Sequence, residues 1–179
     1  MASTCDPECA PVGDVIAALM MVDSRLKAIH SAEGEVTERE RQEFLDQLAK
    51  EIGPVGIDDM LDGTCTLIYM YMTWLRGTHE QHGKDVIEYV VPTLVASMRL
   101  MPKSIRPEVI PMMAGLVVAA GTSLSPNLWR RQYGEWTDDE MTALEATAFL
   151  LAEHISRITE DPEFATRMIT NVLTGTDPE

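Results

Sequence analysis

Two histidines enclose the segment His79-Glu80-Gln81-His82, which holds the clearest candidates for chemistry in this sequence. Side chains three residues apart share one face of a helix, and imidazole nitrogens are good ligands for zinc and other transition metals. The spacing is one residue shorter than in the His-Glu-x-x-His motif of metalloproteases, so Glu80 cannot be assigned the role of its catalytic base. The structural alternative is a polar loop that follows Gly77.

A metal site built on these histidines needs carboxylates from elsewhere, and an aspartate cluster offers them. The candidate ligands of a divalent metal are therefore His79, His82, Asp58 and Asp62, with Asp59 beside them. The aspartates also stand near the start of a predicted helix, where negative charge complements the positive end of the helix dipole. The cluster thus has a structural explanation, and a basic partner protein is a third interpretation.

The remaining reactive residue types fit no known catalytic pattern. The sequence lacks a glycine-rich phosphate loop, a dinucleotide fingerprint and a nucleophile elbow, so no catalytic or cofactor-binding residue is assigned. Cys5 and Cys9 are separated by Asp-Pro-Glu, which departs from the spacing of redox and zinc pairs, and we interpret them as tail residues. Cys65 is interpreted as core, and His30 and His154 as ordinary helical residues.

The chain is acidic, with 29 Asp and Glu against 14 Lys and Arg in 179 residues and a net charge of -15. Such a field repels phosphate backbones and anionic lipid surfaces, so we expect neither nucleic acid nor membrane as a partner. The first residues do not resemble a signal peptide, and the longest apolar stretch, Leu67–Leu75, is shorter than the ~20 residues of a membrane span. We expect a cytoplasmic protein whose charge suits solubility or a basic protein partner.

Helical periodicity runs through almost the whole sequence, and strand alternation is nowhere convincing. In the first predicted helix, Val15, Leu19, Val22, Leu26 and Ile29 follow steps of four and three, which places them on one stripe. We predict helices over residues 13–30, 38–52, 58–76, 84–101, 108–121, 126–134, 138–158 and 162–173.

Local signals predict where several helices begin. Thr37 and Thr137 each stand three residues before a glutamate, which is the pattern of a capping box. Ser125 followed by Pro126 is typical of an N-cap and the first helical residue after it.

Two further features predict how the helices are arranged. The helix over 58–76 is apolar nearly all round, so it is expected to be central and to end at Gly77. Pro92 lies inside the fourth predicted helix, where it removes a backbone hydrogen bond and collides with the preceding turn. We therefore expect a kink or a break near Tyr89.

These elements predict an all-α fold, a compact single-domain bundle or orthogonal array of seven to eight helices. The domain is expected to span residues 13–173, between a flexible N-terminal tail over 1–12 and a frayed C-terminal tail over 174–179.

Two segments of the sequence echo each other, residues 34–40 (Gly-Glu-Val-Thr-Glu-Arg-Glu) and 134–140 (Gly-Glu-Trp-Thr-Asp-Asp-Glu). Recurring cap chemistry explains the match, and duplication of a helical hairpin is the alternative. The first copy, with Ala32 and Glu33 before it, resembles the acidic helix-to-helix turn of tellurite-resistance-B-type domains over nine residues. That resemblance implies an all-helical fold with metal-associated acidic residues in the turn. The family usually carries Asp before the glycine, where this chain has Glu33 and Tyr133.

The segment Trp129-Arg130-Arg131-Gln132-Tyr133 is the only local patch that is both basic and aromatic. In an acidic protein such a patch suits the acidic surface of another copy. We therefore expect a homodimer in which Arg130 and Arg131 lie at the interface.

Three functions are consistent with these observations. The first is a non-enzymatic interaction or regulatory module that presents an acidic helical surface. The second is a helical metal-binding protein or metal-dependent enzyme that uses His79 and His82 with nearby carboxylates. The third is an acidic neutraliser, of the immunity type, for a basic toxin or nuclease, because opposite charge speeds the encounter of such partners.

Overall fold

Two long helices form the centre of the molecule, α3 (Ile57–Glu80) and α8 (Asp138–Thr159). The structure is a computed structural model and describes residues 10–30, 43 and 56–175. The other elements are α1 (Val12–His30), α4 (Val86–Tyr89), α5 (Val91–Arg99), the 3-10 turn η1 (Pro107–Val109), α6 (Ile110–Gly121), α7 (Pro126–Arg131) and α9 (Phe164–Thr174). No strand occurs in these residues, and the predicted all-α fold class is confirmed.

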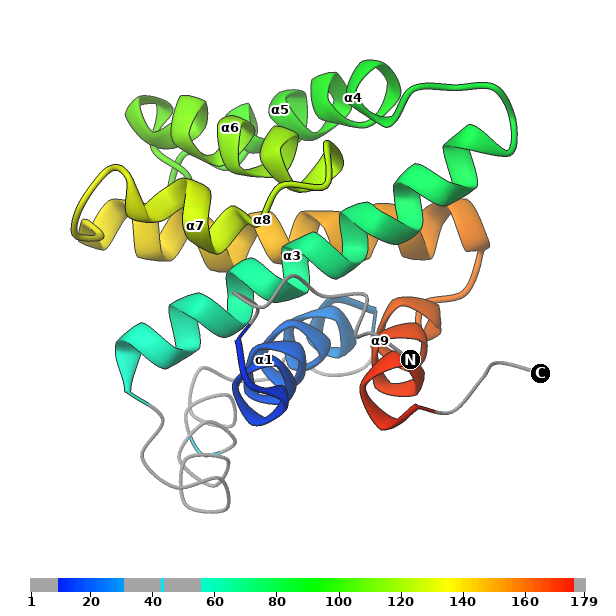
Figure 1. Ribbon diagram of the computed structural model, residues 1–179, viewed down its shortest axis with the longest axis horizontal. Helices are drawn as coiled ribbons and strands as arrows, with labels where there is room; N and C mark the ends of the chain where they lie inside the picture. Colours follow the sequence, from blue (N-terminus) through cyan, green and yellow to red (C-terminus); the bar gives the residue numbers. More distant parts are fainter. Residues whose placement is uncertain (1–9, 31–42, 44–55, 176–179) are drawn as a thin grey trace.

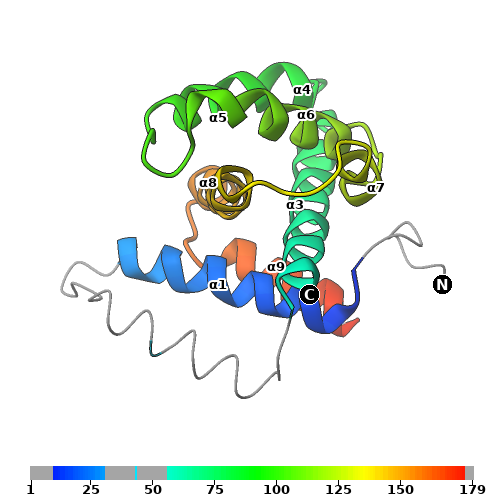
Figure 2. The ribbon, with the colours of Figure 1, turned by 90° about the vertical axis from the view of Figure 1, so that its left-hand side faces the viewer.

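The outer helices lie on two sides of this central pair. In Figure 1, α3 crosses the molecule between α1 and α9 below and α4, α5 and α6 above. Figure 2 shows α8 along its own axis, with α1 on one side and α5 and α6 on the other. Helix α3 packs against α1, α4, α6, α7, α8 and α9, so the prediction that it is central is confirmed.

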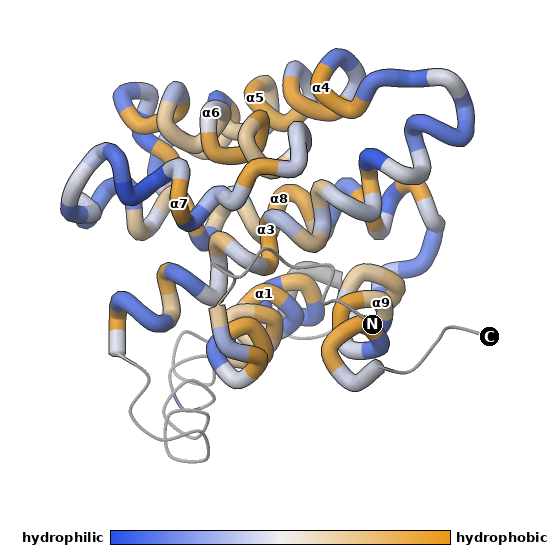
Figure 3. The backbone as a smooth tube through the Cα atoms, viewed as in Figure 1, coloured by the Kyte–Doolittle hydropathy of each residue, from blue (hydrophilic) through white to orange (hydrophobic). Residues whose placement is uncertain are grey.

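The core follows the apolar stripes of the helices. On α3 the side chains of Leu67, Ile68, Met72 and Leu75 have no exposed surface, which explains why this helix is apolar on nearly every side. Figure 3 shows that α6 is also largely hydrophobic, whereas the segment between α3 and α4 is hydrophilic. Among the described helices, none combines the length and the hydrophobicity that crossing a bilayer requires.

The two predicted N-caps that the structure describes, Ser125 and Thr137, are confirmed. The Ser125 hydroxyl accepts a hydrogen bond from the Leu128 amide at 3.3 Å, and the Thr137 hydroxyl accepts one from the Glu140 amide at 3.2 Å. Both side chains thus satisfy an amide that the first helical turn leaves unpaired.

The predicted break near Tyr89 is also confirmed. Helix α4 ends at Tyr89 and α5 begins at Val91, with Pro92 in its first turn. A separate cap starts α4, because the Asp85 carboxylate accepts a hydrogen bond from the Ile87 amide at 2.8 Å.

The end of α3 differs from the prediction. The helix continues through Gly77 to Glu80, and the Gln81 amide donates to the Gly77 carbonyl at 3.2 Å. An ion pair between Arg76 and Glu80, 3.0 Å long and one turn apart, stabilises this last turn against the ~1 kcal/mol that a helical glycine costs. The prediction that Gly77 ends the helix is therefore wrong, and His79 is helical rather than part of a loop.

Other helix bounds differ from the prediction by one to three residues, as at both helices near the carboxyl side of the chain. The helix predicted over 126–134 is α7 and ends at Arg131, and the helix predicted over 162–173 begins at Phe164 and ends at Thr174.

Some predictions fall on residues that the structure does not describe. These are the helix over 38–52, the turn at 34–40 with its tellurite-resistance-B-type resemblance, and most of the two predicted tails. The described end of the N-terminal tail is bonded to the core, since the Ala10 amide donates to the Thr66 hydroxyl at 2.9 Å.

The predicted basic surface patch on α7 is wrong at one of its two arginines. Arg130 is only 2% exposed, because its guanidinium pairs with the Glu140 carboxylate beneath the segment that joins α7 to α8. Arg131 is exposed and lies 3.9 Å from Asp62. A homodimer stays a prediction, but Arg130 cannot lie at its interface in this fold.

Candidate functional site

A cleft at the carboxyl end of α3 gathers three of the four histidines in the chain. His79 comes from the last turn of α3, His82 from the segment that follows it, and His154 from α8. The cleft has a volume of about 480 Å³, a size typical of small-molecule sites. We call it the histidine cleft; its lining residues are Trp74, Thr78, His79, His82, Lys84, Tyr89, His154, Ile158 and Thr159.

The His79 ring is oriented by the backbone of its own helix. Its Nδ1 lies 2.7 Å from the Leu75 carbonyl oxygen. A carbonyl can only accept, so Nδ1 carries the proton and donates, which leaves Nε2 to interact with a ligand. A tight turn follows His79. The His82 and Lys84 amides both donate to the His79 carbonyl, at 3.0 and 2.9 Å. This turn places Lys84 on the rim of the cleft.

The His154 ring is perturbed by its surroundings in the fold. Burial lowers the pKa of His154 below its ordinary value of 6.5, and the neighbouring His79 and Arg157 lower it further. The carboxylate of the adjacent Glu153 forms an ion pair with Arg157 at 2.5 Å. The cleft therefore favours a neutral ring at this position.

Replacing His154 by glutamine is expected to make the fold less sensitive to acid. Because the pKa of His154 is lower in the folded protein, the unfolded chain binds more protons in the window just below pH 6.5. The free energy of unfolding therefore rises with pH across that window and falls as the solution is acidified. Glutamine does not titrate, so the free energy of unfolding of His154→Gln should depend less on pH across that window.

The measurement is urea unfolding of both proteins at about pH 5 and about pH 7.5. The charged and titratable groups that face the ring, His79, His82, Lys84, Glu153 and Arg157, are present in both proteins, so the comparison isolates the effect of His154 itself. Parallel stability profiles would contradict the assignment of acid sensitivity to His154.

The walls of the cleft are aromatic and apolar. The Trp74 ring packs against Phe164 of α9 with 5.2 Å between ring centroids, which holds the indole in place. The Lys84 ammonium lies 5.2 Å from the centroid of the Tyr89 ring, a cation–π distance. Tyr89 and Ile158 are 48% and 45% exposed, so both leave apolar surface uncovered at the rim.

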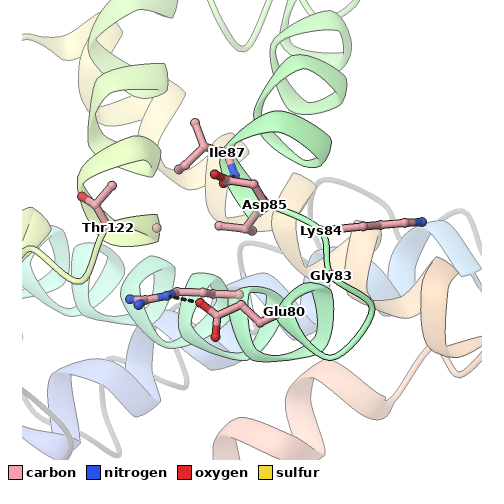
Figure 4. A pocket seen from close by; sticks show the side chains of 9 residues that line it. Glu80, Gly83, Lys84, Asp85, Ile87 and Thr122 are labelled. Carbon is pink, nitrogen blue, oxygen red and sulfur yellow. Dashed lines mark hydrogen bonds and ion pairs between the residues drawn. The ribbon is translucent and has the colours of Figure 1, made fainter.

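A second cavity, of about 580 Å³, lies on the other side of the same turn and is lined by charged residues of both signs. Glu80 pairs with Arg76 at 3.0 Å, and Figure 4 shows that Lys84 points away from Glu80. The Asp85 carboxylate is used as the cap of α4. Because these charges already have partners within the fold, this cavity is a weaker candidate site than the histidine cleft.

The predicted aspartates lie at the opposite end of α3. Asp58 and Asp59 are in its first turn, Asp62 follows one turn later, and Asp14 in the first turn of α1 adds a fourth carboxylate. We call these four residues the aspartate cluster. Burial raises the pKa of Asp62, and the other three carboxylates raise it further although Arg131 lies 3.9 Å away. Burial and Asp59 likewise raise the pKa of Asp14.

The structure does not bring His79 and His82 together with Asp58 and Asp62. At about 1.5 Å of rise per residue, Asp62 and His79 are separated by roughly 25 Å along a straight helix. Within the described residues, no group of three or more His, Cys, Asp or Glu side chains is placed to hold a metal ion. The four predicted ligands thus belong to two separate places on the molecule.

Two other groups with acid–base chemistry are buried away from the cleft. Burial raises the pKa of the Cys65 thiol and of the Tyr71 hydroxyl far above their ordinary values. The prediction that Cys65 is a core residue is confirmed, and the Tyr71 hydroxyl has no hydrogen-bond partner among the described residues. Cys5 and Cys9 lie outside the described part of the chain.

Comparison with known proteins adds no relative: no protein-family model, no curated protein and no solved structure matches this chain. Function has to be argued from the geometry of the two sites.

Proposed function

We propose that this protein is a non-enzymatic interaction module that binds a basic partner protein through the aspartate cluster. The observation that carries the proposal is the gathering of four carboxylates at the first turns of α1 and α3, where burial and mutual repulsion raise the pKa of Asp14 and Asp62. A cation at this surface would relieve the mutual repulsion that contributes to both shifts. The net charge of -15 would attract such a partner from a distance.

Helix dipoles alone do not account for the aspartate cluster. The positive end of α3 stabilises Asp58 and Asp59, as the positive end of α8 stabilises Asp138 and Asp139. On α8, however, Asp139 is paired with Arg106 at 3.2 Å. Within the described part of the chain, the ion pair of the aspartate cluster is that of Arg131 with Asp62, and its length of 3.9 Å is at the limit of an ion pair. Among the same residues, Asp58 and Asp59 form no ion pair like that of Asp139 with Arg106.

The proposed partner is defined by its charge. It presents several lysines or arginines that converge on the aspartate cluster. A basic toxin or nuclease held inactive by this protein is one partner of that class, and a regulated basic protein is another. Both predict an association whose rate and affinity fall as salt is added, because exposed charges are screened within about 10 Å at ordinary ionic strength.

The proposal is tested by calorimetric titration of the full chain with an oligolysine peptide of about ten residues, at about 50 and 300 mM NaCl. Asp58→Asn/Asp59→Asn is expected to weaken binding about fivefold at the lower salt concentration, because it removes half of the aspartate cluster.

The matched control is Asp138→Asn/Asp139→Asn. It removes the same two charges from adjacent, exposed aspartates in the first turn of another long helix, and it should weaken binding by less than about twofold. Equal losses in the two variants would show that the peptide responds to net charge alone, and the proposal would then be wrong.

A further inference from the structure

We infer that the histidine cleft binds a small organic anion with an aromatic body, such as an aromatic carboxylate. This site is separate from the aspartate cluster, and the inference does not depend on the proposed function. Three observations carry it: the charge of the lining residues, the aromatic walls, and the arrangement of the hydrogen-bond donors.

The charge of the lining opposes that of the whole molecule. The chain holds 29 Asp and Glu against 18 residues with a basic side chain, the 14 Lys and Arg and the 4 His. Yet none of the nine described residues that line the cleft is acidic, and Lys84 brings a positive charge beside the neutral or positive imidazoles of His79 and His82. The acidic surface elsewhere on the molecule repels an anion, whereas the lining of the cleft attracts one.

The walls suit a flat apolar body. Trp74 is fixed by Phe164, and Tyr89 and Ile158 leave about half of their surface exposed at the rim. A ring placed between these side chains would bury apolar surface, at about 25 cal/mol per Å². The volume of about 480 Å³ holds one ring system with a short polar substituent.

The donors lie at the rim, where a carboxylate would sit. Lys84 has three ammonium donors and no acceptor, and its ammonium lies over the Tyr89 ring rather than in an ion pair with the nearby Asp85 or Glu80. His79 is already held at Nδ1 by the Leu75 carbonyl, so its Nε2 is the ring atom left for a ligand, and Nε2 donates to a carboxylate when the ring is doubly protonated.

A metal ion fits the cleft less well than an anion does. The described residues provide no carboxylate there to complete the coordination of His79 and His82, and the Lys84 ammonium would repel a cation. If the cleft bound Zn²⁺ and no anion, it would be a metal site instead of an anion site.

The experiment is calorimetric titration of the full chain with cinnamate, with its neutral analogue cinnamamide, and with Zn²⁺. Cinnamate is expected to bind about tenfold or more tightly than cinnamamide, which is the size expected for one hydrogen bond between charged groups. Lys84→Gln should remove most of that difference. The matched control, Lys103→Gln, removes an exposed lysine outside the cleft and should leave the difference intact.

The outcomes separate this inference from the proposed function. Binding of cinnamate that survives in Asp58→Asn/Asp59→Asn and is lost in Lys84→Gln supports the anion site, whatever the oligolysine titration shows. Equal affinity for cinnamate and cinnamamide, no binding of either compound, or binding of Zn²⁺ alone would overturn the inference. Circular dichroism of Lys84→Gln confirms that a loss of binding does not come from unfolding.

Discussion

Arg130→Met is expected to destabilise the fold by about 3–5 kcal/mol, the cost typical of leaving one partner of a buried ion pair without the other. The Glu140 side chain is 14% exposed, so its carboxylate would lose its counter-ion in a place that water reaches poorly. Methionine nearly matches the length of the arginine stem, so the loss would reflect the guanidinium rather than a cavity.

The guanidinium joins three parts of the molecule. Its Nε and one terminal nitrogen donate to the Glu140 carboxylate, and the two terminal nitrogens also donate to the carbonyls of Gly134 and Glu135 at 2.9 and 3.2 Å. Its centre lies 4.2 Å from the centroid of the Trp136 ring. One side chain therefore holds the end of α7, the connecting segment and the start of α8 in register.

Chemical denaturation with urea measures this prediction, and Arg131→Met is the matched control. Arg131 is the next residue on the same helix, but its side chain is 55% exposed and its ion pair with Asp62 is long, so its loss should cost less than about 1 kcal/mol. Arg130→Lys should fall between the two, because an ammonium keeps the charge but cannot donate in the planar fork of a guanidinium.

A double-mutant cycle with Glu140→Gln tests whether the pair itself is responsible. If it is, the loss in Arg130→Met/Glu140→Gln will be smaller than the sum of the two single losses. Additive losses, or an Arg130→Met variant as stable as Arg131→Met, would show that the buried contact contributes little to the fold.

Interactions between near neighbours in the chain were predictable from the sequence. The caps at Ser125 and Thr137 and the break before Pro92 each depend on residues no more than four positions apart, which a sequence pattern reports directly. The central position of α3 was predictable for a different reason, since a helix that is apolar on all sides needs neighbours on all sides.

Burial of single polar residues was not predictable in the same way. Arg130 and Arg131 are adjacent and chemically identical, yet one is buried and the other exposed. The difference depends on which of them faces Glu140 after α8 has docked. The Thr137 and Glu140 pattern predicted a capping box. The structure has the Thr137 half of it, whereas the Glu140 carboxylate accepts from Arg130 of the preceding helix, which nothing in the pattern indicated.

The candidate site was predicted in part. His79 and His82 share one cleft, as their spacing indicated, but Asp58 and Asp62 lie at the far end of the same helix. His154 was interpreted as an ordinary helical residue because its neighbours in the cleft are remote in sequence. Lys84 enters the site because the chain turns tightly over the His79 carbonyl, a turn that could be expected only once α3 was known to pass Gly77.

Gly63→Ala is expected to destabilise the protein by about 1–3 kcal/mol, even though alanine is the better helix former. Gly63 lies where α3 crosses the first turn of α1. A Cβ atom built there would be 2.3 Å from the carbonyl oxygen and 2.7 Å from the carbonyl carbon of Asp14. These are backbone atoms, so no side-chain rotation can relieve the overlap and the two helices must move apart.

Gly77→Ala on the same helix is the matched control, and its effect should have the opposite sign. A Cβ atom at Gly77 would meet no other atom within 4 Å, so only the helix propensity changes, and stability should rise by about 0.5–1 kcal/mol. Urea unfolding of both variants measures the two effects. If Gly63→Ala stabilised the protein as Gly77→Ala does, the close crossing of α1 and α3 would be wrong, because at that crossing the alanine methyl group would overlap the backbone of Asp14.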